Sequence, residues 1–180
     1  MELLVAGENV EPELLAEVST LGYPPRVIGV YRRDDLPRGT RDATLALWHV
    51  ADPGNVGTLI RSAEAFGAGV ALSAGCADRT GPKALRASAG AVFRVPVCGF
   101  DEARGTHVAL VAHGGIPLHD VELERPVVLV LGAEREGLPA DVLARCDRQA
   151  SIPLAEGAES LNVATAGAIA LYELARRSGS

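Results

Sequence analysis

The sequence is poor in the residues that mark exported, membrane-spanning or metal-binding proteins. It has 3 cysteines, which are far apart, so neither a disulfide framework nor a CxxC metal or redox site is indicated. No apolar run reaches the ~18 residues that span a membrane, and acidic residues stand near the N-terminus where a signal peptide would be basic. The 4 histidines follow no spacing typical of zinc ligands. We therefore expect a cytoplasmic protein that holds no metal and contacts no membrane.

Lysine is almost absent: Lys83 is the only lysine among the 17 lysine and arginine residues. The net charge of -6 argues against a polyanionic partner, but residues 51–100 carry five basic and three acidic side chains and are net positive. The guanidinium of arginine suits phosphate recognition, although a general preference for arginine codons would give the same composition. The candidate phosphate contacts in this stretch are Arg79, Lys83, Arg86 and Arg94.

The length of 180 residues and the 48% apolar content allow one compact core. Residues 11–20 predict a helix, residues 27–31 a strand and residues 32–41 a charged link, with too little apolar material to fold alone. From Thr44 onward strand and helix patterns alternate, which predicts an α/β fold with a mostly parallel sheet and helices on both faces. The predicted strands are residues 45–50, 70–72, 108–112, 127–131 and 150–152, and the predicted helices are residues 56–66, 82–88, 140–145 and 161–176.

Three loops follow predicted strands at their carboxyl ends, where open α/β sheets bind ligands. In the first loop, Asn55 is most simply a helix N-cap, and Arg61 lies opposite the apolar stripe, as a solvated side chain would. The second loop holds Gly132 and Gly137, which let a backbone approach a ligand closely. It is neither a Walker A nor a Rossmann loop, and Glu134 would repel phosphate. A neutral or cationic ligand and an ordinary glycine-containing turn both fit it.

The third loop, Ile152-Pro153-Leu154, leads to a helix rich in small residues. Ser160 is predicted to be its N-cap, with Asn162 beside the unpaired amides of the first turn. Small residues such as Ala164 and Gly167 would allow another backbone to approach the helix closely. Most Ser-x-Asn helix starts are capped core helices without chemistry, so this motif alone assigns no function.

Taken together, the three loops resemble the three motifs of the SpoU branch of the SPOUT RNA methyltransferases. Asn55 followed six residues later by Arg61 matches the first motif, and residues 131–138 match the second. The third motif matches Ile152-Pro153-Leu154 leading to residues 160–163 and 171–173. The resemblance covers residues 44–177, and residues 86–97 resemble the segment that such enzymes carry between the first two motifs.

This resemblance implies a parallel α/β sheet whose C-terminal part forms a deep trefoil knot. Such proteins bind S-adenosylmethionine in the knot, form homodimers that complete the active site, and methylate a ribose 2'-hydroxyl of ribosomal or transfer RNA. We expect ribosomal RNA rather than transfer RNA. Residues 42–180 would form the methyltransferase domain, and residues 1–41 resemble the last helix and strand of a substrate RNA-binding domain that is otherwise missing.

The resemblance also implies which residues form the site. The expected catalytic residues are Asn55, Arg61, Glu134, Ser160 and Asn162, and the expected cofactor-binding residues are Leu131, Gly132, Gly137, Ile152, Leu154 and Leu161. A guanidinium keeps its proton at neutral pH, so Arg61 suits stabilisation of a developing alkoxide better than proton abstraction. We expect Glu134 to orient that guanidinium while a substrate phosphate or water takes the proton.

Two other functions are compatible with parts of the sequence. The first is a non-catalytic RNA-binding or dimerisation module that keeps the knot without turnover, against which the intact Arg61, Glu134 and Asn162 argue. The second is a generic α/β nucleotide-binding enzyme, which would need a phosphate-binding loop that this sequence does not contain.

Overall fold

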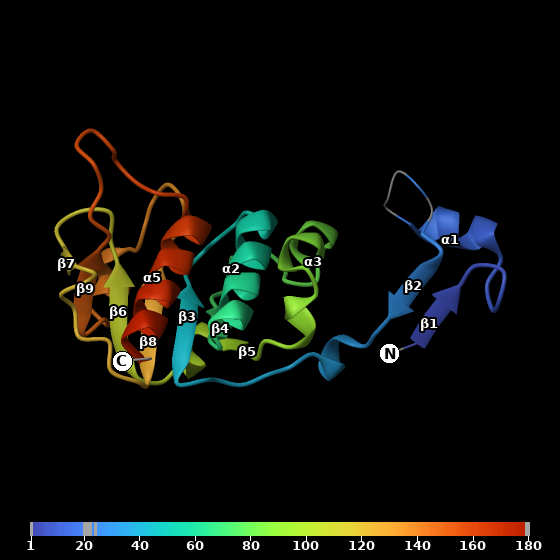
Figure 1. Ribbon diagram of the computed structural model, residues 1–180, viewed down its shortest axis with the longest axis horizontal. Coiled ribbons are helices and arrows are strands. Elements are labelled where there is room, and N and C mark those ends of the chain that lie inside the picture. The colour runs from blue at the N-terminus through green and yellow to red at the C-terminus, as the bar shows by residue number, and fades with distance from the viewer. Residues whose placement is uncertain (1, 20–22, 24, 179–180) are drawn as a thin grey trace. The chain divides into compact units, whose positions relative to one another are not determined.

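The computed structural model describes residues 2–19, 23 and 25–178, which form two compact units, Met1–Leu36 and Pro37–Ser180. In the first unit, β1 (Glu2–Val5) pairs antiparallel with β2 (Val27–Val30), and α1 (Pro12–Val18) stands between them in sequence (Figure 1). The strand β1 was not predicted, and the predicted helix over residues 11–20 is shorter than expected. Residue 20 lies outside the described part of the chain.

The second unit is built on a seven-stranded sheet in the order β5-β4-β3-β8-β6-β9-β7. All six neighbouring pairs are parallel, as the alternation of strand and helix patterns predicted. The strands are β3 (Ala43–Leu47), β4 (Gly69–Leu72), β5 (Val97–Gly99), β6 (Thr106–Leu110), β7 (Ile116–Pro117), β8 (Val127–Leu131) and β9 (Arg148–Ser151).

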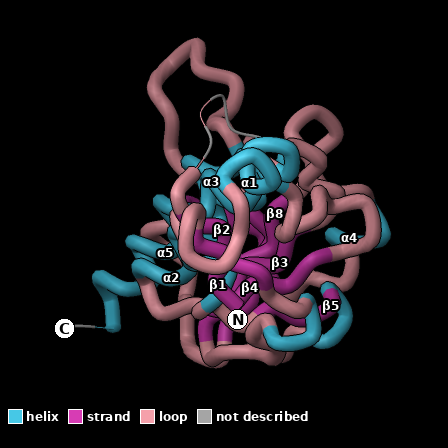
Figure 2. Tube along the Cα trace, turned by 90° about the vertical axis from the view of Figure 1, so that its right-hand side faces the viewer, coloured by secondary structure: helices cyan, strands magenta, loops and turns pink. Residues whose placement is uncertain are grey.

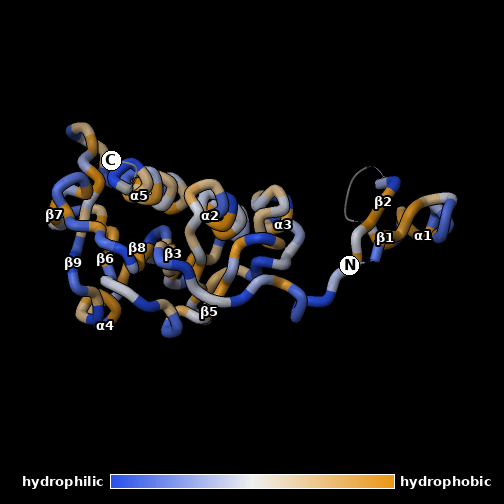
Figure 3. Tube along the Cα trace, turned by 60° about the horizontal axis from the view of Figure 1, so that its bottom comes forward, coloured by the Kyte–Doolittle hydropathy of each residue, from blue (hydrophilic) through white to orange (hydrophobic). Residues whose placement is uncertain are grey.

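Helices cover both faces of this sheet, also as predicted. The helices α2 (Pro53–Ala65), α3 (Pro82–Ser88) and α5 (Val163–Ser178) lie on one face, and the short α4 (Ala140–Leu143) lies on the other (Figure 3). The view along the sheet in Figure 2 shows the same arrangement, with the strands between α2 and α5 on one side and α4 on the other.

The central strands β3 and β8 are buried along their whole length, because helices cover both of their faces. Their side chains alternate between two apolar cores. Leu45 and Leu129 point to the larger core under α2 and α5, whereas Ala46, Val128 and Val130 point to the smaller core under α4. Packing on both faces fixes the carboxyl edge of the sheet, from which the loops after β3 and β8 leave.

Glycine permits close packing of the three helices on the larger core. A Cβ at Gly57 of α2 would overlap the carbonyl oxygen of Ala84 in α3 and lie 2.7 Å from the Cβ of Ala87. A Cβ at Gly167 of α5 would overlap the side chain of Leu59 in α2. At Gly167, α5 therefore admits a neighbouring side chain, rather than the backbone that the sequence suggested.

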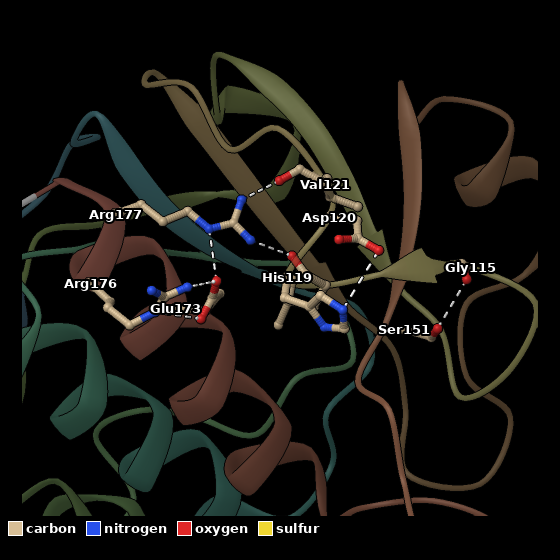
Figure 4. A network of polar contacts seen from close by, with 9 residues as sticks. Gly115, His119, Asp120, Val121, Ser151, Glu173, Arg176 and Arg177 are labelled. Carbon is tan, nitrogen blue, oxygen red and sulfur yellow. Dashed lines mark hydrogen bonds and ion pairs between the residues drawn. The ribbon is translucent and has the colours of Figure 1, made fainter. Parts of the chain in front are cut away.

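The C-terminal part of α5 is tied to the segment that follows β7 (Figure 4). The Arg177 guanidinium donates to the carbonyl oxygens of Val121 and of Leu118, the latter at 2.7 Å, and to the Glu173 carboxylate at 2.8 Å. Glu173 also accepts from Arg176, and its side chain is only 14% exposed. The guanidinium of Arg176, followed by that of Arg177, lowers the pKa of Glu173 to about 2.

We expect the Glu173→Gln variant to unfold at lower urea concentration at pH 7, with a loss of about 1–2 kcal/mol, because the charged hydrogen bonds to two arginines are weakened and water reaches part of the pair. The pKa of Glu173 is lower in the folded state than its ordinary value of 4.5, so its contribution is present above pH 4.5 and is lost as the pH falls toward 2. Urea unfolding of the two chains between pH 7 and pH 3 measures this. Glu156→Gln, in an exposed loop, is the control. If the difference in unfolding free energy between Glu173→Gln and the parent does not shrink as the pH falls, the stabilising role of the Glu173 carboxylate is contradicted.

Candidate functional site

Two cavities meet at the loop that follows β8, at the carboxyl edge of the sheet. The first, of about 350 Å³, we call the loop pocket; it is lined by residues 110–112, 131–137, Ile152, Leu154, 160–161, Val163 and Ala166. The second, of about 670 Å³ and more open, we call the amide pocket; it is lined by His49, Ala51, Asp52, Asn55, Gly75, 133–136 and Asn162. Residues 133–136 line both cavities, so the two share one wall.

The loop after β8 closes on itself through its two glycines. The Gly137 amide donates to the carbonyl of Ala133 at 2.9 Å, and Gly137 has a φ of 66° that an L-residue rarely adopts. A Cβ at Gly132 would overlap the carbonyl of Gly137 and lie 2.6 Å from the amide nitrogen of Leu138. The closure shapes the loop pocket, whose lining includes every residue expected at the cofactor: Leu131, Gly132, Gly137, Ile152, Leu154 and Leu161.

Three of the expected catalytic side chains form one hydrogen-bonded chain. Asn162 Oδ1 accepts from the amides of Ala164 at 2.9 Å and Thr165 at 3.2 Å, which leaves Asn162 Nδ2 to donate to Asn55 Oδ1 at 3.1 Å. Asn55 Nδ2 then donates to Glu134 Oε1 at 2.8 Å. The backbone amides require the oxygen of the Asn162 carboxamide to face the helix. This fixes which atom of Asn162 faces Asn55, and in turn which atom of Asn55 faces Glu134. We call this series the amide chain.

The start of α5 differs from the prediction. Asn162, not Ser160, is the N-cap, and the helix begins at Val163 rather than at residue 161. Both residue types are good caps, and the carboxamide oxygen of Asn162 reaches two first-turn amides at once. Ser160 is exposed in the preceding loop and lines the loop pocket.

The start of α2 also differs from the prediction, because the cap is Asp52 rather than Asn55. Asp52 Oδ1 accepts from the amides of Gly54 at 2.6 Å and Asn55 at 3.0 Å, and Pro53 occupies the first helical position. Lys83 donates to Asp52 Oδ2 at 2.6 Å, and this hydrogen bond, together with the amides, holds the pKa of Asp52 below its ordinary value. Capping by Asp52 frees the Asn55 side chain for the amide chain.

Arg61 is not brought to the amide chain within one copy of the protein. It lies six residues beyond Asn55 on α2, which on an α-helix means about 9 Å along the axis and a face about 120° away. Its side chain is exposed, lines neither cavity, and makes no hydrogen bond or ion pair within the described ranges. The structure therefore unites Asn55, Glu134 and Asn162 and leaves Arg61 on the outer surface of α2.

The candidate phosphate contacts are partly neutralised by carboxylates of the same chain. Arg94 forms an ion pair with Glu64, and Lys83 forms one with Asp52. Hydrogen bonding from Arg94 lowers the pKa of Glu64, and the charge of Arg61 adds a smaller effect in the same direction. Arg86 stays exposed on α3. The net positive charge of residues 51–100 therefore overstated how much cationic surface is free to contact a polyanion.

The sequence analysis did not select His49 as a site residue. In the structure, His49 lines the amide pocket. The sequence analysis placed His49 inside the predicted strand over residues 45–50, whereas β3 ends at Leu47 and leaves His49 in the loop at the carboxyl edge of the sheet. No group of three or more His, Cys, Asp or Glu side chains among the described residues could hold a metal ion. Within the same residues, none of the helices combines the length and the apolar character that crossing a membrane requires.

The sequence is similar to those of known RNA methyltransferases. The chain is 36% identical over 188 residues to the 23S rRNA (uridine(2479)-2'-O)-methyltransferase of Streptomyces viridochromogenes, a match that covers 92% of this chain and 66% of that relative. It is 34% identical over 172 residues to the 23S rRNA (guanosine(2553)-2'-O)-methyltransferase of Bacillus subtilis, covering 90% of this chain and 69% of that relative.

Solved structures give the same result. The fold is similar to that of the SpoU methyltransferase AviRb from Streptomyces viridochromogenes in complex with AdoMet, with a TM-score of 0.78, 31% identity, and coverage of 94% of this chain and 72% of that one. The chain spans 45% to 66% of the length of several curated relatives that it matches. Residues 42–172 match the SpoU rRNA Methylase family. The chain therefore belongs to the SpoU rRNA methylase family.

Proposed function

We propose that this chain is an S-adenosylmethionine-dependent methyltransferase that acts on a ribose 2'-hydroxyl of RNA in the cytoplasm, with ribosomal RNA favoured over transfer RNA. The observation that carries the proposal is the position of Glu134. It ends the amide chain and also lines the loop pocket, together with all six residues expected at the cofactor. The names of the relatives, which are 2'-O-methyltransferases of 23S rRNA, support the same reaction.

The loop pocket fits S-adenosylmethionine by its chemistry. Leu131, Ile152 and Leu154 offer apolar contacts of the kind that an adenine ring needs, and Gly132 lets the backbone come close. The Glu134 carboxylate on the shared wall favours a sulfonium and disfavours phosphate. A volume of about 350 Å³ lies in the range of small-molecule sites. When bound, the cofactor supplies an electrophilic methyl group.

The chain's own residues would position the ribose and stabilise its charge. The 2'-hydroxyl must lose a proton as it is methylated, so the site needs fixed polar groups around a developing alkoxide. The amide chain provides such groups, because Asn162 is fixed by two backbone amides and Glu134 is fixed by Asn55. Ser160, on the lining of the loop pocket, would add a hydroxyl beside them.

We place Arg61 in this site through a homodimer in which the Arg61 of one subunit reaches the amide chain of its partner. Support comes from the exposure of Arg61, which makes no hydrogen bond or ion pair within the described residues of its own chain. It also comes from Tyr172, which is 57% exposed on α5 and packs edge-on against Phe66 at the C-terminal end of α2. An exposed aromatic on the same helical layer suits an interface between two copies. The Arg61 guanidinium would pair with the developing alkoxide.

A deep trefoil knot is the topology that we propose for the C-terminal part. The strand β9 pairs with β6 and β7 at one end of the sheet, whereas α5 returns to pack on α2 and β8 near the middle. Arg177 then joins α5 to the segment after β7. These contacts support a C-terminus that is threaded past the preceding loops. We further propose that residues 1–41 belong to the RNA-binding part, a role that suits a separate small unit.

Transfer of labelled methyl groups tests the proposed reaction. The purified chain, incubated with labelled S-adenosylmethionine and total RNA, is expected to label ribosomal RNA at a ribose, which resists alkaline cleavage at the modified position. Mapping of that position identifies the nucleotide. Label found in a base would contradict ribose methylation, and label confined to transfer RNA would contradict the preferred substrate.

The alternative function, an RNA-binding or dimerisation module without turnover, is tested by the same preparation. Calorimetric titration with S-adenosylmethionine and the labelling assay together separate the two functions. Cofactor binding with methyl transfer supports the enzyme. RNA binding without cofactor binding or methyl transfer, in the presence of a folded chain by circular dichroism, supports the module. The intact amide chain favours the enzyme, because a module without turnover has no need of a polar series between its two cavities.

A further inference from the structure

His49 lies at the amide pocket but has no part in the function described so far. It follows β3 by two residues and lines the cavity together with Asn55, Glu134 and Asn162. It is exposed, and its imidazole makes no hydrogen bond or ion pair within the described part of the chain. A histidine with both ring nitrogens available, beside a polar series of this kind, is placed to bind a ligand.

The backbone at His49 adopts a conformation that its side chain does not favour. Its φ is 53°, and the only other non-glycine residue with positive φ among those described is Ala89. Hydrogen bonds on both sides hold the turn, since the Trp48 amide donates to Leu131 at 2.8 Å and the His49 amide donates to Ser73 Oγ at 2.9 Å. Residues in the left-handed region are enriched at functional sites, where the surrounding structure imposes them.

The imidazole ring itself is held in place by its neighbours. It stacks on Trp48 with ring centroids 4.7 Å apart and an interplanar angle of 5°, and Trp48 in turn packs edge-on against Phe100 at 5.1 Å. Gly75 lies close to the ring, because a Cβ there would be 3.2–3.4 Å from three ring atoms. The ring is therefore positioned before any ligand arrives, which lowers the entropic cost of a hydrogen bond to it.

We propose that His49 binds the RNA nucleotide that is methylated, through a hydrogen bond from a ring nitrogen to a neutral polar atom of its base edge or ribose. This inference rests on the proposed function. A phosphate is disfavoured as the partner, because the carboxylates of Asp52, Glu134 and Glu136 line this cavity against the single guanidinium of Arg135, and Lys83 offsets only Asp52. A neutral hydroxyl, carbonyl or amine of the nucleotide can pair with imidazole in either tautomer. His49 is thus a substrate-binding residue, distinct from those that line the loop pocket.

Two substitutions test this role without disturbing the backbone. Glycine and asparagine both tolerate positive φ, so His49→Gly and His49→Asn should fold as the parent does. We expect His49→Gly to raise the KM for RNA about 10-fold, with kcat and the Kd for S-adenosylmethionine within about twofold of the parent. His49→Asn keeps a hydrogen-bonding group and should return the KM to within about threefold. His113→Asn, on an exposed loop outside both cavities, is the control and should leave the KM unchanged.

The outcomes separate this inference from the proposed function. If the parent chain does not methylate RNA, the proposed function is wrong. If the parent methylates RNA and His49→Gly has the same KM, the RNA contact is wrong. A fall in kcat at unchanged KM, not restored by asparagine and accompanied by loss of an acidic limb in the pH-rate profile, would mean that His49 takes the proton, which also overturns the RNA contact.

Discussion

Lysine in place of Arg61 is expected to lower kcat for RNA methylation about 100-fold, and alanine about 1,000-fold. Lysine keeps the charge but not the planar pair of donors, so the difference between the two variants reports how much of the effect depends on the guanidinium shape. The Kd for S-adenosylmethionine should stay within about threefold of the parent, because Arg61 does not line the loop pocket. Single-turnover rates and calorimetric titration measure the two quantities. Methylation by Arg61→Lys at the parent rate would show that the assignment is wrong.

A mixing experiment tests whether Arg61 acts across two subunits. Arg61→Ala and Glu134→Ala should each be almost inactive alone. In a mixed dimer, one site receives a native Glu134 from one subunit and a native Arg61 from the other, while the second site lacks both. Random mixing after mild unfolding should therefore restore about one quarter of the parent activity, because half of the dimers are mixed and each has one native site. No regain of activity, in dimers verified as mixed by mass, would mean that Arg61 does not act in the partner's site.

Alanine in place of Gly132 is expected to weaken S-adenosylmethionine binding about 100-fold, the second large effect. Its Cβ would overlap backbone atoms of Gly137 and lie 2.6 Å from the Leu138 nitrogen, and backbone cannot move aside as a flexible side chain can. The loop must then open, at a cost of up to about 3 kcal/mol, and the cavity that it shapes changes. Calorimetry with the cofactor and thermal unfolding of the free chain measure the two consequences.

The matched control lies in the same loop. Gly137→Ala places a Cβ where nothing lies within 4 Å, at a φ of 66°, so only backbone strain of about 1 kcal/mol is expected. Cofactor affinity should fall by less than about tenfold. Equal effects of the two alanines would indicate that loop conformation, and not the overlap at Gly132, governs binding. Unchanged affinity in Gly132→Ala would remove the loop from the cofactor site.

The sequence predicted the sheet and its covering well, for reasons that can be named. Residues 127–131 form β8 and residues 82–88 form α3 with the predicted bounds, because an uninterrupted apolar run and a Gly-Pro start are strong local signals. The predicted strands 45–50, 70–72, 108–112 and 150–152 begin one or two residues earlier in the structure. Some of their first residues become strand through pairing with neighbours rather than by their own preference, as Arg148 does by pairing with Val108.

Elements that depend on long-range contacts could not be predicted in this way. The strands β1, β5 and β7 are two to four residues long and carry too little periodicity to be recognised. The helix α2 begins at Pro53, three residues before its apolar stripe, because Asp52 caps it and proline suits the first position. Ser160 and Asn162 are equally good caps by residue type, and only the conformation of the loop selects Asn162.

The sequence predicted which residues belong to the candidate site, but it did not predict how they are arranged in space. The resemblance to the family selected Asn55, Glu134 and Asn162, which form the amide chain, and six residues that line one cavity. It could not tell whether Arg61 meets them in its own chain, because helical spacing places Arg61 and Asn55 on different faces of α2. His49 was passed over because the conformation that marks it is a backbone angle, which a single sequence does not display.

The amide chain has a direction, and it begins at the first turn of α5. Each of its links donates away from the helix, so the positive end of the helix dipole is relayed through two carboxamides to a carboxylate on another loop. An acid at position 162 would break the relay at its origin, since it could accept from the helix but could offer Asn55 no proton. A shift of α5 by a fraction of a helical turn would likewise be transmitted through Asn162 and Asn55 to Glu134, so the position of the C-terminal helix would set the position of a carboxylate on another loop.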